Sequence, residues 1–303
     1  MQAEKNSGAQ RVNDQRGFTL VELMIALVVA IIAIGAVYAV YSVQQREYRN
    51  QQLRQAIQQN LRGAMVIMEQ QIRMAGYDPE DSGRFGITDV RRYDLVTTDA
   101  DPGGQPALFF TWDADENGAP EEGRPAGKYP DGSNRYRNRE HCNFRMRDDK
   151  ATGRRYLAWD NGGGRKTLAE NIQAMGLAYG VDNDGDGRID TWAGGAFPIW
   201  AVDADGDNRL DTHLDADNNG VIDELDDTNG DLRVTADDGG KIDPPIGVER
   251  IRSVRVWLLA ASAHPVQGHF DQSPYVVGDR IYLDSGDHLV RRMEQTTIVC
   301  RNL

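Results

Sequence analysis

Several features that would point to catalysis or to nucleic-acid binding are absent from this sequence. Its 303 residues include only 2 cysteines and 5 histidines. These form no zinc-type cluster and no arrangement with a serine or cysteine nucleophile. Neither a glycine-rich phosphate loop nor a basic patch is present. We therefore expect neither an enzyme nor a nucleic-acid-binding protein.

The N-terminus also lacks a secretory signal peptide, because residues 1–17 contain no apolar run of their own. An apolar run follows instead, and it carries no charge over the 21 residues from Leu23 to Val43. At a rise of about 1.5 Å per residue this helix would be about 31 Å long, which matches the hydrocarbon core of a bilayer. We predict a membrane span over residues 18–43. Glu22 places a costly carboxylate inside that span and is therefore a functional candidate.

The residues around Glu22 carry a family resemblance. Residues 17–24, Gly-Phe-Thr-Leu-Val-Glu-Leu-Met, resemble the processing site of type IV prepilins and of type II secretion pseudopilins. The resemblance implies a leader over residues 1–17, a prepilin-peptidase cut between Gly17 and Phe18, and methylation of Phe18. It also implies that Glu22 pairs with the N-terminal amine of a neighbouring subunit, a cation that a buried carboxylate needs. The alternative is an ordinary anchor with Glu22 in the headgroup region.

Beyond the span, apolar residues recur at every third or fourth position, which predicts one continuous helix over residues 18–76. No proline interrupts it, and Gly76 followed by Asp78-Pro79 is a helix-end signal. The apolar stripe is expected to pack on a globular head formed by residues 77–303. Its members are Leu53, Ile57, Leu61, Met65, Met68, Ile72 and Ala75.

The head is predicted to contain a set of about six β-strands, of which Ile251–Ala261 has the clearest pattern. Residues 81–105 and the Arg-rich region up to Asp149 are expected to be loops. One long helix followed by an antiparallel sheet gives an α+β fold of the type IV pilin kind, with the stripe covering one sheet face. The expected strands are 107–112, 155–160, 168–181, 251–261, 275–283 and 296–300.

Three short stretches refine the resemblance. They are Ile72-Arg73-Met74-Ala75-Gly76-Tyr77, Tyr179-Gly180-Val181-Asp182, and Thr296-Thr297 with Arg301-Asn302. In this order along one chain they resemble the PilW-type minor pilins of type IV pili.

The net charge of −13 comes from one segment. Residues 182–243 hold 18 Asp or Glu against 4 Lys or Arg, a local charge of −14, which leaves +1 for the remaining residues. Asp or Asn recurs at alternate positions in four stretches, which start at Asp182, Asp203, Asp215 and Asp227. Oxygen ligands at positions 1, 3 and 5, a turn glycine at 6, a carbonyl at 7 and a later acid make up a calcium loop. Without a cation these carboxylates would repel one another.

We therefore expect the acidic insertion, residues 182–243, to bind calcium in helix-free loops and to become ordered with it. The alternative is a solvated acidic loop with local turns. The expected ligands are Asp182, Asp184, Asp186, the Arg188 carbonyl, Asp190, Asp203, Asp205, Asp207, Asp211, Asp215, Asp217, Asn219, the Val221 carbonyl, Asp223 and Asp226. Further candidates, whose loops fill the pattern less completely, are Asp113, Asp115, Asn117, Asp227, Asn229 and Asp231.

Cys142 and Cys300 are the two cysteines. If the head is exported, an oxidising compartment favours a disulfide between them. Closing a loop of about 158 residues would stabilise the fold by roughly 5 kcal/mol. The alternative is two unpaired buried thiols.

Together these features predict a minor pilin that takes part in type IV pilus assembly, in a priming or tip complex, with a calcium-stabilised head. Its partners would be prepilin peptidase, other minor pilins, the major pilin and a tip adhesin. We expect a single-pass inner-membrane protein with a cytoplasmic N-terminus, later part of a pilus at the surface of a Gram-negative-type bacterium. Two alternatives remain open: a minor pseudopilin of a type II secretion system, and a calcium-dependent adhesive binding module.

Overall fold

The structure is a computed structural model and describes residues 17–95, 101, 103–120, 140–149, 151–161, 164–266, 268–283 and 286–303. The expected leader lies outside these residues except for Gly17. The chain divides into two compact units, residues 1–52 and residues 53–303.

The N-terminal unit consists, where it is described, of Gly17, Phe18, Thr19 and the first part of helix α1 (Leu20–Ile72). Its large apolar side chains between Leu20 and Val43 are exposed in the single chain. By length and composition α1 is able to cross a membrane, as the apolar run predicts.

The C-terminal end of α1 lies within the head unit. The helix is shorter than the expected 18–76, because its last regular residue is Ile72 and a turn follows. Gly76 then leaves the helix with φ +75°, and its N–H donates to the Thr111 carbonyl at 2.9 Å. A Cβ at Gly76 would lie 2.8 Å from the Asn302 carbonyl oxygen, so glycine is required here for space as well as for conformation.

Two antiparallel sheets make up most of the described head, in place of the single sheet that the sequence predicts. In the first sheet the order is β1-β3-β4-β5-β6, and β2 also pairs with β3. Its strands are β1 (Ile87–Asp89), β2 (Arg92–Tyr93), β3 (Gln105–Thr111), β4 (His141–Asp148), β5 (Arg155–Asp160) and β6 (Arg165–Glu170).

The second sheet has the order β10-β9-β8-β7-β11-β14, and a separate hairpin pairs β12 with β13. Its long central pair is β7 and β11, which match residue by residue from Tyr179↔Val254 to Met175↔Leu258. The strands are β7 (Ile172–Val181), β8 (Ala201–Val202), β9 (Arg209–His213), β10 (Lys241–Gly247), β11 (Ile251–Ala261), β12 (Tyr275–Val277), β13 (Arg280–Tyr282) and β14 (Arg291–Val299). Four 3-10 turns lie between them: η1 (Trp192–Gly194), η2 (Glu224–Asp226), η3 (Ala236–Asp238) and η4 (Val248–Arg250).

Several strand predictions need correction. The segment 168–181 divides into β6 and β7 at Asn171, whose φ of +55° breaks the strand. The segment 275–283 is a hairpin, because Gly278 turns the chain with φ +66°. The regions expected to be loops contain the strands β1, β2 and β4. Their polar surroundings do not indicate strands, and each forms by pairing with β3.

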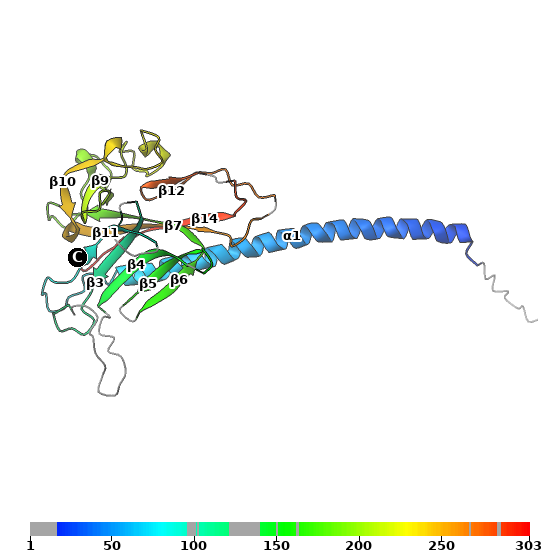
Figure 1. Cartoon of the computed structure of the whole chain (residues 1–303), viewed down its shortest axis with the longest axis horizontal. Helices are drawn as coiled ribbons and strands as arrows, with labels where there is room; N and C mark the ends of the chain where they lie inside the picture. Colours follow the sequence, from blue (N-terminus) through cyan, green and yellow to red (C-terminus); the bar gives the residue numbers. More distant parts are fainter. Residues whose placement is uncertain are drawn as a thin grey trace, which may run out of the picture. The chain divides into compact units, whose positions relative to one another are not determined.

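The second sheet is covered on both faces. The predicted helix stripe, from Ile57 to Ala75, packs with Val254, Val256 and Leu258 in the main core, which the first sheet also joins. On the opposite face Trp257 and Leu259 pack against apolar residues of the acidic insertion and of the β12–β13 hairpin. In Figure 1 the yellow loops around β9 and β10 lie on one side of β7 and β11, and the end of α1 lies on the other. The acidic insertion is thus a folded layer of the head.

Candidate functional site

The predicted processing site leads directly into α1. Thr19 caps the helix, because its hydroxyl accepts a hydrogen bond from the N–H of Glu22 at 3.2 Å. The N–H and the hydroxyl of Thr19 both donate in return to Oε2 of Glu22, each at 2.9 Å. This capping box places Gly17 and Phe18 outside the helix and Glu22 in its first turn. The Phe18 side chain is 89% exposed.

Five Asp-rich loops of the head share one backbone conformation. In each, the residues at positions 4 and 6, counted from the first Asp, have positive φ. The pairs are Glu116 and Gly118, Gly185 and Gly187, Gly206 and Asn208, Asn218 and Gly220, and Gly230 and Leu232. Two of these loops place Asn208 or Leu232 where the calcium-loop pattern has glycine, and they still adopt the same turn.

The first Asp of each loop organises that turn. Its Oδ2 accepts a hydrogen bond from the N–H of the sixth residue at 2.8 to 3.0 Å in all five loops. Its Oδ1 accepts from the fourth or fifth residue at 2.6 to 3.1 Å. Four of these five aspartates are buried: Asp113, Asp182, Asp203 and Asp215.

Four loops gather three carboxylates around one point. In each group, one oxygen per residue lies within 4.8 Å of the others. The closing acid comes from position 9 or position 12 of the loop, or from outside it. The groups are Asp113, Asp115 and Glu140; Asp182, Asp184 and Asp190; Asp203, Asp205 and Asp211; and Asp215, Asp217 and Asp226.

Other predicted ligands are not brought into these groups. The side chains at position 5 accept hydrogen bonds from the N–H at position 7 instead, at 2.7 to 2.8 Å. Asp223 caps η2 by accepting from the Leu225 N–H at 2.8 Å. The position-5 residues are Asp186, Asp207 and Asn219, and their donors are Arg188, Arg209 and Val221.

The loop that starts at Asp227 forms no three-carboxylate group among the described residues. Asn229 and Asp231 accept hydrogen bonds from N–H groups of their own turn. The buried Asp238, which the sequence analysis missed, closes this loop by accepting from the N–H of Thr228 at 2.9 Å and of Thr235 at 2.8 Å. Its spacing, position 12 from Asp227, is a signal that could have identified it.

Glu140 is the second missed residue. It is buried, and its Oε1 accepts from the Ala114 N–H at 3.3 Å. Glu140 lies 27 positions after Asp113, at the start of the unrecognised strand β4, so no local pattern connects it with that loop.

Two aspartates of these groups, the first residue of one loop and the last ligand of another, have strongly raised pKa values. Burial, with the charges of Asp211 and Asp205 close by, raises the pKa of Asp203 to about 6. Burial, with Asp217 and Asp215 close by, likewise raises the pKa of Asp226 to about 6. For both side chains, burial makes the ionised form unfavourable.

These clusters have the chemistry of a hard-cation site. They offer only oxygen donors, several of them buried, from side chains already oriented by backbone hydrogen bonds. Calcium accepts six to eight oxygen ligands, and carboxylates are its strongest protein donors. The donor set therefore suits a hard divalent cation, and Asp182, Asp203 and Asp215 are among its buried members.

The predicted disulfide needs correction. Cys142 and Cys300 are free and buried. Cys142 lies on β4 of the first sheet, and its Sγ accepts from Nε1 of Trp159 at 3.1 Å. Cys300 directly follows β14 at the edge of the other sheet. Burial raises the pKa of each thiol to about 12, so both are inert apolar-like core groups.

Comparison with known protein families finds two matches, both within residues 12–195. Residues 12–38 match the family model described as the prokaryotic N-terminal methylation motif. Residues 50–195 match the model of prepilin peptidase-dependent protein B. The chain therefore has a prepilin-type N-terminal methylation motif and a region similar to prepilin peptidase-dependent protein B. No curated protein matches the chain significantly.

A solved structure with some likeness is the type IV-like pilin TTHA1219 from Thermus thermophilus. It shares 12% identity with this chain at a TM-score of 0.37, and the match covers 82% of this chain and 98% of TTHA1219.

Proposed function

We propose that this pilin-like chain is a minor pilin of the PilW type that takes part in type IV pilus assembly, in a priming or tip complex. The observation that carries the proposal is the junction at Gly17-Phe18, which lies outside the helix directly before an apolar span. A junction outside the helix is accessible to a peptidase, because a helical peptide bond is hydrogen-bonded into its own turn. The match to the N-terminal methylation motif supports the same reading.

Glu22 would then direct assembly. Among the residues that the structure describes, Thr19 alone donates hydrogen bonds to the Glu22 carboxylate, at Oε2. In the hydrocarbon core an ionised carboxylate is costly unless a cation compensates it. Cleavage after Gly17 would create such a cation, the α-amine of Phe18, and a neighbouring subunit would present it. Pairing between subunits therefore follows processing.

We also propose that calcium stabilises the head. Within residues 182–243 the net charge is −14, and three groups of carboxylates converge there. Burial and, to a smaller extent, the neighbouring carboxylates raise the pKa values of Asp203 and Asp226, and a divalent cation in each group would offset both effects. Because these loops form the layer over Trp257 and Leu259, ordering them would also protect the second core.

The assembly proposal is tested by intact mass spectrometry of the protein from sheared surface filaments and from membranes of the same cells. We expect a filament species that begins at methylated Phe18. Glu22→Gln should still be cleaved but should be lost from filaments. The matched Glu69→Gln, at a half-buried position of α1 in the head where the carboxylate pairs with Arg73, should not be lost. A full-length protein confined to the membrane would refute the proposal.

The same cells distinguish the alternatives. Deletion should abolish pili and twitching motility if the chain is a minor pilin, and protein secretion if it is a type II pseudopilin. For an adhesive module, removal of residues 182–243 would abolish calcium-dependent attachment while pili still form. Calcium binding itself is tested by circular dichroism and protease resistance of the mature protein with calcium and with EGTA. Identical results in the two conditions would refute the calcium proposal.

A further inference from the structure

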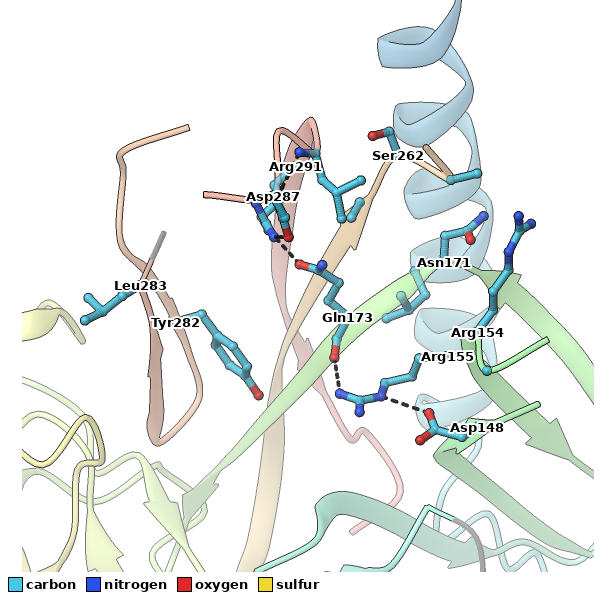
Figure 2. A pocket seen from close by; sticks show the side chains of 15 residues that line it. Asp148, Arg154, Arg155, Asn171, Gln173, Ser262, Tyr282, Leu283, Asp287 and Arg291 are labelled. Atoms are coloured by element: carbon cyan, nitrogen blue, oxygen red, sulfur yellow. Dashed lines mark hydrogen bonds and ion pairs between the residues drawn. The ribbon is translucent and has the colours of Figure 1, made fainter. Parts of the chain in front are cut away.

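A second candidate site lies in the head, in a cavity whose described lining includes no residue of the acidic insertion. It has a volume of about 510 Å³ and is open to solvent. The turn between β4 and β5, the β6–β7 junction at Asn171, and the ends of β11 and β13 form its walls. Figure 2 shows this cavity from close by.

One glutamine orients two arginines in this cavity. The main-chain carbonyl of Gln173 accepts a hydrogen bond from Nη1 of Arg155 at 2.8 Å. Its side-chain Oε1 accepts from Nε of Arg291 at 2.7 Å. Asp148 and Asp287 bind the other sides of these guanidinium groups, Asp148 at 3.1 Å from Nε of Arg155. Both cations are therefore held in place before any ligand arrives, which lowers the entropic cost of binding.

The charges on the described cavity wall do not cancel. Three arginines, Arg154, Arg155 and Arg291, face two carboxylates, Asp148 and Asp287, which leaves one positive charge. Arg155 and Arg291 each have a carboxylate partner, and Arg154 has none among the described residues. One anionic group would complete the balance, and a carboxylate matches the planar donor edge of a guanidinium.

The rest of the wall alternates hydrogen-bond donors and acceptors. Because Oε1 of Gln173 is used by Arg291, its amide NH₂ remains as a donor. In Figure 2 the hydroxyl of Tyr282 and the guanidinium of Arg155 point toward one another below Gln173. The amide of Asn171 and the second oxygen of Asp148 add further polar positions, and Ile172 and Ala261 supply an apolar floor.

We propose that this cavity binds a hydroxylated carboxylic acid of monosaccharide size, a hexuronic acid being the simplest example. Its carboxylate offsets the extra positive charge of the wall and lies against Tyr282 and Nη2 of Arg155. This guanidinium nitrogen is left over because Nε donates to Asp148 and Nη1 to the Gln173 carbonyl. The hydroxyl groups of the ligand are bound by the amides and by Asp148. A neutral sugar lacks the charge that the cavity needs, and an acidic amino acid lacks the hydroxyls. The site gives the pilin-like head a ligand that the acidic loops cannot bind, because they repel anions.

The test is a titration of the full chain in detergent micelles with sodium glucuronate, followed by saturation-transfer NMR or calorimetry. EGTA is present, so that calcium cannot bridge the ligand to the acidic loops. Glucose and N-acetylaspartate are the matched probes without the carboxylate and without the ring hydroxyls. A weak, millimolar affinity is expected for a ligand of this size.

Glucuronate should bind, and both matched probes should bind at least about tenfold more weakly. Arg155→Gln should weaken glucuronate binding by about tenfold or more, because it removes a charge-assisted hydrogen bond. Tyr282→Phe should weaken it severalfold with little effect on folding, which keeps the test valid if Arg155→Gln is unstable. The exposed Arg84→Gln changes the net charge equally and should leave binding unchanged.

Three results would overturn the proposal: a failure of glucuronate to bind, a loss of binding in Arg84→Gln as large as in Arg155→Gln, or binding of glucose as tight as that of glucuronate. If N-acetylaspartate binds as tightly as glucuronate, the cavity recognises the carboxylate alone and the assignment to a sugar acid is wrong.

Discussion

Substitution of one buried carboxylate should stabilise the calcium-free protein. Asp226 has an ordinary pKa of 3.8 that the fold raises to about 6, chiefly through burial. Between pH 3.8 and 6 the unfolded chain has lost this proton while the folded chain still holds it, so folding stability falls as pH rises through that window. At about 1.4 kcal/mol per unit, the penalty above pH 6 is about 3 kcal/mol.

Asp226→Asn removes that penalty. Asparagine keeps one acceptor but loses one of the two backbone hydrogen bonds, from Asp217 and Asp223, which costs about 1 kcal/mol. The variant should therefore be about 2 kcal/mol more stable than the parent in EGTA at pH 7.5, a rise in Tm of roughly 4–8 °C. At pH 4 the advantage should vanish. In calcium the sign should reverse, because the variant lacks a charged ligand.

The assay is thermal unfolding of the mature chain in detergent, followed by the fluorescence of its 5 tryptophans. Asp238→Asn is the matched control, because it also removes a buried acid at position 12. Burial opposes ionisation of Asp238, but hydrogen bonds from Thr235 and Thr228 lower its pKa overall. Asp238→Asn should therefore destabilise the protein at pH 7.5 in EGTA. A lower Tm for both variants in EGTA would refute the reasoning about Asp226.

Three further predictions concern the backbone and the thiols. Gly176→Ala should lower the free energy of unfolding by about 1–3 kcal/mol, because its Cβ would lie 2.6 Å from the carbonyl carbon of Val277. Gly63→Ala, at a helix position with open space around it, should raise the free energy of unfolding by about 0.5–1 kcal/mol. Urea unfolding curves measure both, and an unchanged Gly176→Ala would mean that the hairpin does not pack on β7. Leu232→Gly should stabilise the protein by about 1 kcal/mol in the same assay, because Leu232 has φ +67° and its side chain is 40% exposed. A loss of stability would contradict this account of backbone strain. Cys142 and Cys300 should both resist alkylation at pH 8 in the native protein, and both should react after denaturation without reductant. A mass spectrum that shows only a disulfide-linked form would contradict the free thiols.

Two of the three short stretches that suggested the PilW resemblance, 72–77 and 301–302, come into contact in the folded head. The Asn302 side chain donates to the Arg73 carbonyl at 3.0 Å, and Gly76 lies against Asn302 and Leu303. The 179–182 stretch ends β7, where Val181 pairs with Ile251. The order of the three stretches along the chain was visible in the sequence. The contact between the first and the last, however, joins residues that are more than 200 positions apart.

Local signals determined much of this protein. The uncharged run from Leu23 to Val43, the helix stripe, and the Asp spacing at Asp182, Asp203 and Asp215 each lie within one element. Because the spacing of these residues follows directly from helix or turn geometry, the sequence alone indicated α1 and the acidic loops.

Tertiary structure decided the rest. β4 lies in a polar, Arg-rich region, where the short alternation of Cys142, Phe144 and Met146 is a weak strand signal that pairing with β3 and β5 completes. Glu140, directly before that strand, reaches the Asp113 loop through it. The cavity around Gln173 joins residues from six strands (β4, β5, β7, β11, β13 and β14) and from the turns next to them. Such contacts form because distant segments share one core, and no local pattern in a single sequence records which segments will meet.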